Sequence, residues 1–78
     1  MKELIEYIAT SLVSDPTQVE ITQTRRGPQT ILKLRVAKED MGRVIGKSGR
    51  VANAMRVLLR VAAAQEGKRA ELDIVEPE

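Results

Sequence analysis

The stretch GRVIGKSG, residues 42–49, decides how this chain is to be interpreted, because it ends like a phosphate-binding loop. In ATP- and GTP-hydrolysing enzymes that loop requires a glycine, four further residues and then Gly-Lys-Ser or Gly-Lys-Thr. Here three residues separate Gly42 from Gly46, and Met41 stands where the first glycine belongs. The residues before it are polar, whereas the enzymes have a buried strand there. The sequence therefore excludes a nucleotide-hydrolase loop.

The same residues contain a second pattern, Gly46-Lys47-Ser48-Gly49, which is a GxxG sequence between two predicted helices. Glycine lets the backbone turn sharply and lets a sugar-phosphate chain approach closely. The helix that follows presents unpaired amides and a positive dipole end to a phosphate. Lys47 and Arg50 add positive charge, and Ser48 adds a hydroxyl. The alternative is a corner between helices whose glycines only permit the bend.

Positive charge is concentrated around this loop. The chain has 78 residues and a net charge of +2. Between residues 41 and 60 there is no acidic residue and there are five basic ones: Arg43, Lys47, Arg50, Arg56 and Arg60. The rest of the chain has 8 basic and 11 acidic residues, a net charge of −3. Such a separation of charge favours a polyanionic partner.

Several classes of function are disfavoured by what the sequence lacks. It has no histidine and no cysteine, and its one aromatic residue is Tyr7. We find no nucleophile–base pair, no carboxylate dyad and no metal-ligand cluster, so we expect no catalytic residues, no metal, no cofactor and no small-molecule substrate. The apolar runs are too short to span a membrane, so we expect a cytoplasmic protein with no membrane partner.

Hydrophobic periodicity predicts an α+β fold with three helices and three strands. The expected elements are a helix at 1–13, strands at 19–22 and 30–36, a short helix at 38–45, a long helix at 49–66 and a strand at 70–75. Residues 25–29 are expected to form the turn between the first two strands. We expect Gly46 to end the short helix, Ser48 to cap the long one and Gly67 to end it.

Residues 44–50, VIGKSGR, resemble the VIGxxG signature of KH domains, and the order α-β-β-α-α-β resembles their type II form. The opening MKEL, the run EDMG at 39–42 and AAQEGKR at 63–69 resemble small bacterial single-KH proteins of the KhpA type. Lys38 departs from this pattern, because proline is common there in these relatives. The resemblance implies that residues 1–78 form one KH domain, with a three-stranded sheet covered on one face by helices.

The resemblance also implies a function. KH domains clamp about four nucleotides of a single strand. Transferred to this chain, the RNA-binding residues would be Arg43, Gly46, Lys47, Ser48, Gly49 and Arg50. Ile45 either packs inward or touches a base, and we expect it to pack inward. The family implies an RNA chaperone or post-transcriptional regulator linked to cell-envelope growth and cell shape. The alternative is a protein-interaction module, a dimerisation domain in which the GxxG loop is vestigial.

The long helix carries more apolar surface than one sheet can cover. Its apolar residues span about 200° of a helical wheel, whereas packing on one sheet needs a little over 100°. Either the first helix covers the excess, or a second KH domain does. The second alternative gives a homodimer, or a heterodimer with a KhpB/Jag-type KH protein, through Met55, Leu58, Leu59 and Ala62. Arg56 and Arg60 either extend the phosphate contacts along the helix or are only solvated, and we expect solvation. Arg25 and Arg26 either make an auxiliary contact or only form a charged turn, and we expect the turn.

Overall fold

A computed structural model describes residues 1–76 of the chain. The three helices are α1 (Lys2–Leu12), α2 (Met41–Ile45) and α3 (Arg50–Gln65). The three strands are β1 (Glu20–Arg26), β2 (Gln29–Arg35) and β3 (Arg69–Val75). Single turns of 3-10 helix lie at Pro16–Gln18, Lys38–Asp40 and Lys47–Gly49. The α+β class is confirmed, and the helices and strands follow one another in the expected order.

The strands form one mixed sheet in the order β1-β2-β3. β1 and β2 are antiparallel, whereas β2 and β3 are parallel. The hairpin closes through Gly27 and Pro28 alone, with Gly27 at a φ of 59°. β1 is therefore longer than predicted and continues to Arg26, which pairs with Gln29. The sequence did not indicate this extension because the residues from Thr22 to Arg26 are polar and exposed, so they carry no apolar alternation.

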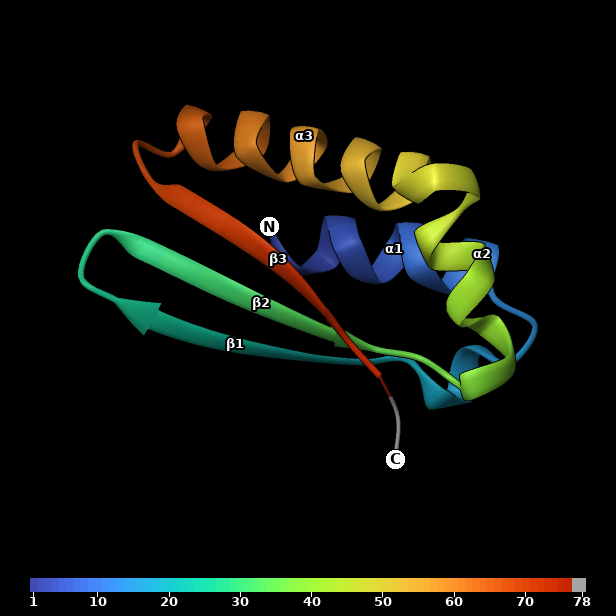
Figure 1. Cartoon of the computed structure of the whole chain (residues 1–78). Coiled ribbons are helices and arrows are strands. Elements are labelled where there is room, and N and C mark those ends of the chain that lie inside the picture. Colours follow the sequence, from blue (N-terminus) through green and yellow to red (C-terminus); the bar gives the residue numbers. More distant parts are fainter. Residues whose placement is uncertain (77–78) are drawn as a thin grey trace.

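The helices cover one face of the sheet and leave the other face open (Figure 1). The core lies between the covered face and the helices, and its largest members are Ile5, Leu32, Leu34, Val36, Val44, Met55 and Leu59. Each strand supplies alternate residues to this layer, as the period of two along a strand requires. The first helix is amphipathic, and Ile5 and Ala9 are its buried residues.

The buried side of α3 corrects part of the predicted dimer surface. Met55 is 1% exposed and Leu59 is 0% exposed, so both belong to the core and neither can meet a partner. Val57, Leu58 and Val61 are 54%, 48% and 53% exposed. They lie on the outward side of α3, next to the exposed Ala54. The alternative that the first helix covers the excess apolar surface of α3 is correct in part, because α1 contacts α3. However, α1 leaves this outward surface uncovered.

The segment between α1 and β1 is held by carboxylates. Asp40 is buried, and its two oxygens accept hydrogen bonds from the backbone N–H groups of Ser14 (3.0 Å) and Asp15 (3.2 Å). Asp15 in turn accepts hydrogen bonds from Thr17 and Gln18, which lower the pKa of its carboxyl group. Asp40 thus ties the end of α1 to the start of α2, across 26 residues of chain. No helix within residues 1–76 is both long and apolar enough to cross a bilayer.

Candidate nucleic-acid interface

The loop between α2 and α3 depends on its two glycines. Gly46 has φ and ψ of 73° and 177°, and Gly49 has 75° and 14°. Side chains rarely tolerate either conformation, and the first is almost confined to glycine. A Cβ atom on Gly46 would also lie 2.5 Å from Cγ2 of Val51. Gly46 therefore permits both the turn and the close approach of α3, whereas Gly49 is required for its backbone conformation alone.

Ser48 does not cap α3, which corrects the prediction. The N-cap of α3 is Gly49, and no side chain bonds the first amides of the helix. Ser48 has a left-handed backbone with φ 55° and ψ 27°, and it is exposed. Gly46 does end α2 with a positive φ, and Gly67 follows α3 with a φ of 68°, as predicted. The loop is open to solvent, and N–H groups without a capping side chain lie behind it.

Two of the three predicted cations at the loop are free of acidic partners. Lys47 and Arg50 are exposed, and no carboxylate within residues 1–76 lies within 4.0 Å of either. Arg43 differs, because its Nε lies 3.9 Å from Oδ1 of Asp40 and its Nη1 donates to the Ser14 hydroxyl. The structure therefore brings Lys47, Ser48 and Arg50 together at the loop, and it joins Arg43 to the α1–β1 segment.

Ile45 was expected to pack inward, and this prediction is wrong. Its side chain is 37% exposed, whereas Val44 is fully buried. Successive residues of a helix differ in direction by about 100°. Since α2 has only five residues and Val44 faces the core, Ile45 faces partly outward beside the loop. An aliphatic side chain is thus available next to the predicted phosphate contacts.

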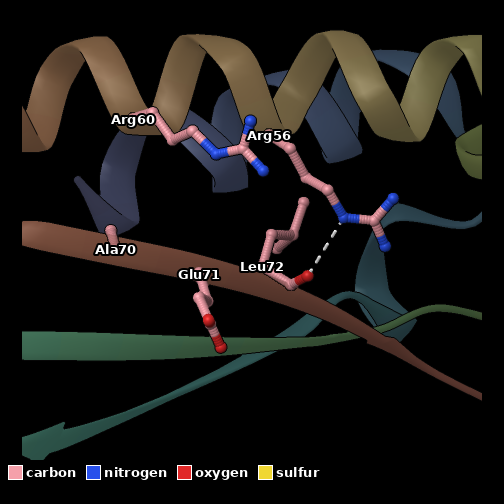
Figure 2. Close-up of a pocket in the computed structure, with 5 residues that line it drawn as sticks. All are labelled: Arg56, Arg60, Ala70, Glu71 and Leu72. Carbon is pink, nitrogen blue, oxygen red and sulfur yellow. Dashed lines mark hydrogen bonds between the residues drawn. The ribbon is translucent and has the colours of Figure 1, made fainter.

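A groove lies between α3 and the edge strand β3, at residues that follow the loop along α3. Its hollow of about 170 Å³ is lined by Arg56, Arg60, Ala70, Glu71 and Leu72 (Figure 2). Arg56 reaches from α3 toward Leu72 on β3, Arg60 extends along α3 toward Arg56, and the Glu71 side chain points to the other side of the strand (Figure 2). The groove therefore has a cationic wall on α3.

Arg56 was expected to be solvated, but it is half-buried and bonded. Its Nε donates to the Leu72 carbonyl oxygen at 3.3 Å, and its Nη1 donates to Oδ1 of Asn53 at 3.2 Å. Arg60 remains exposed, as do Arg25 and Arg26 at the end of β1. The sequence analysis also did not predict the hydrogen bonds that Asn53 and Asp40 make. Asn53 carried a detectable signal, since it lies on the same side of the helix as the arginines.

The comparisons with known proteins agree with this geometry. A family model described as "KhpA/KhpB, KH domain" matches residues 2–74. The chain is 47% identical over 75 residues to the RNA-binding protein KhpA of Clostridium acetobutylicum, covering 96% of this chain and 100% of the relative. It is 45% identical over 76 residues to the RNA-binding protein KhpA of Listeria monocytogenes, covering 97% and 100%. The chain therefore belongs to the KhpA/KhpB family of KH-domain proteins.

Proposed function

We propose that this protein binds single-stranded RNA, with a phosphate of the strand at Gly46–Gly49 and its bases in the groove between α3 and β3. The observation that carries the proposal is the loop itself, which has two glycines at positive φ and exposed Lys47 and Ser48 between them. The relatives named RNA-binding protein KhpA, which match over nearly the whole chain, support it.

The chemistry of the loop suits a phosphate. The first N–H groups of a helix have no intrahelical partners and lie at the positive end of its dipole. Here no side chain caps those of α3, although the Arg50 N–H donates to the Lys47 carbonyl within the loop. Lys47 and Arg50 add two exposed positive charges at the loop, and neither has a carboxylate within 4.0 Å among residues 1–76. Phosphate contacts of this kind fix the position of a strand without reading its sequence, so we expect broad sequence tolerance.

The groove suits bases. Arg56 and Leu72 belong to its lining, and Arg56 donates hydrogen bonds to the Leu72 carbonyl and to the neighbouring Asn53. Splayed-out bases are bound by hydrogen bonds to their edges and by contact with their faces. With Tyr7 the only aromatic residue, base faces would rest on aliphatic side chains such as Ile45.

RNA affinity is expected to fall with salt concentration in a defined way. For single strands, the slope of log affinity against log salt is about −0.7 for each phosphate contact. A groove holding about four nucleotides then gives a slope of about −2 to −3. Fluorescence anisotropy with a labelled oligonucleotide between low and physiological salt measures this slope. A slope near zero would contradict phosphate binding at the loop.

A second surface supports a role in protein association. We propose that the outward side of α3, with Ala54, Val57, Leu58, Val61 and the half-buried Ala62, contacts a second KH domain. That domain is a second copy of this chain or the KH domain of a KhpB/Jag-type partner. Small alanine side chains allow two helices to approach closely. This surface also favours the alternative function, a dimerisation module with a vestigial loop.

Substituting Leu58 with glutamate is expected to shift the protein to monomer, because two buried carboxylates would face each other across the pair. Leu58 is about half exposed, so the fold is expected to remain intact. Tyr7→Glu is the matched control, since Tyr7 is exposed on α1. Light scattering at micromolar concentration measures the effect. A parent protein that is strictly monomeric would contradict self-association.

In the cell, we propose that the protein acts in the cytoplasm as an RNA chaperone or post-transcriptional regulator, linked to cell-envelope growth and cell shape. It would act without catalysis, because the sequence offers no nucleophile–base pair. The support for this role is the family resemblance. A crosslinking survey of bound transcripts in cells tests it, and enrichment of messages for envelope proteins is the expected result.

A further inference from the structure

The uncovered face of the sheet carries one unusual row of side chains. Three of its cross-strand rows each contain one carboxylate: Glu20–Arg35–Val75, Thr22–Lys33–Asp73 and Thr24–Ile31–Glu71. The fourth row, Arg26–Gln29–Arg69, lies beside the hairpin turn and contains two cations and no carboxylate. The Arg69 amide also donates to the Pro28 carbonyl at 3.3 Å, so the turn and the start of β3 are joined.

Two further cations meet this row from the helix side. A hollow of about 430 Å³ at the start of β3 is lined by Gln29, Ala64, Ala70, the basic residues Arg60, Lys68 and Arg69, and one acidic residue, Glu71. We refer to Arg26, Arg60, Lys68 and Arg69 as the hairpin-end cluster. Within residues 1–76, none of these four side chains has a carboxylate within 4.0 Å. Three of these cations line one hollow, and Arg26 joins them through the Arg26–Gln29–Arg69 row, although it lines a separate hollow with Glu71 and Asp73.

The hairpin-end cluster continues the groove. Arg60 belongs to both, since it lines the hollow beside Arg56 and the hollow beside Lys68. The hairpin turn and the start of β3 lie at the end of the molecule opposite to α2 (Figure 1). From Arg50 at the loop to Arg60 the helix rises about 15 Å, at about 1.5 Å per residue. A single-stranded RNA that is bound at the loop and runs along α3 therefore reaches the hairpin-end cluster.

We propose that the hairpin-end cluster is a second phosphate-binding site, which holds the part of a single-stranded RNA that extends beyond the groove. The proposal rests on the proposed function, and it extends the footprint beyond the roughly four nucleotides of a KH groove. Arg26 and Arg69 flank β2, so their Cα atoms lie about 10 Å apart, two strand spacings. Side chains as long as arginine can converge on one phosphate from that separation, or hold two neighbouring phosphates.

The chemistry of the cluster favours RNA over a protein ligand. A protein partner is usually anchored by buried aromatic or aliphatic side chains. The row at the hairpin end offers only Arg26, Gln29 and Arg69, all of them polar. An extended polyanion needs charge and hydrogen bonds but no apolar anchor, and the cluster supplies both. Because the cluster is continuous with the groove, its expected ligand is an RNA that is already bound in the groove.

The length of the RNA provides the test. We expect the Arg26→Gln/Arg69→Gln variant to bind an oligonucleotide of about four nucleotides as tightly as the parent does. With an oligonucleotide of about twelve nucleotides, its affinity is expected to be about tenfold lower. The salt slope for the longer RNA is expected to become shallower by about 0.7 for each lost contact. Fluorescence anisotropy or calorimetry measures all three.

The matched control is Lys33→Gln/Arg35→Gln, which removes the same charge from the same face of the sheet but beside Asp73 and Glu20. We expect this control to bind both RNAs like the parent. Equal affinity of parent and hairpin-end variant for the longer RNA would overturn the proposal, and so would an equal loss in the control. Lys47→Asp/Ser48→Asp separates the two proposals, because failure of the loop proposal leaves that variant's binding unchanged at both lengths.

Discussion

Replacing both Lys47 and Ser48 with aspartate is expected to weaken RNA binding by about 100-fold or more, which corresponds to about 2.7 kcal/mol. The change places two negative charges where a phosphate is proposed to sit, and it removes one of the two unpaired cations at the loop. The fold is expected to survive, because both side chains are exposed. Aspartate also tolerates the left-handed backbone of Ser48 at φ 55°. RNA affinity and a thermal unfolding curve measure the two effects.

The control for this variant is Lys33→Asp/Ser11→Asp. It makes the same two types of substitution and the same change in net charge, at exposed positions on the open sheet face and on α1. We expect it to lose affinity only slightly, through the general change in charge. RNA binding that is equally strong in the loop variant and the parent would leave the dimerisation module as the function.

Substituting Gly46 with alanine is expected to destabilise the protein by about 3 kcal/mol or more. Two costs add together at this position. The backbone at φ 73° and ψ 177° is poorly tolerated by any side chain, and the new Cβ would lie 2.5 Å from Cγ2 of Val51. For a domain of this size that is a large part of the total stability. Urea unfolding followed by circular dichroism measures the change.

Two other glycines serve as internal controls. Gly49→Ala has the strained φ of 75° but no close contact, so we expect a loss of about 1 kcal/mol. Gly42 lies within α2, and a Cβ there would meet nothing within 4 Å. Gly42→Ala is therefore expected to stabilise the protein by about 0.5 kcal/mol or more. If Gly46→Ala were not the least stable of the three variants, the role assigned to Gly46 would be contradicted.

The sequence predicted the features that depend on local pattern. Gly46 and Gly67 were expected at the ends of helices, and both have positive φ. The order of helices and strands was also predictable, because the periodicity of apolar residues is a local pattern. β1 was too short in the prediction because Gln23 and Arg25, on the helix-facing side of the strand, are polar and exposed beyond the cover of the helices.

Features that depend on contacts between distant residues were not predictable. Asp40 looked like an acidic residue at a helix start, yet it binds amides of the α1–β1 segment. The same carboxylate lies 3.9 Å from Nε of Arg43, one of the predicted RNA-binding residues. The apolar span of α3 was also visible in the sequence. Which part of it faces the sheet depends on where α1 and the strands lie, so Met55 and Leu59 could not be distinguished from Leu58.

The groove and the outward apolar surface are two sides of one helix, α3. Joining two copies through that surface would fix two grooves in one rigid unit, related by a two-fold axis. Two segments of transcript would then be held as neighbours, and capture of the second would become an intramolecular event at high effective concentration. A domain that binds only a few nucleotides would thereby gain avidity for transcripts that offer two unpaired segments.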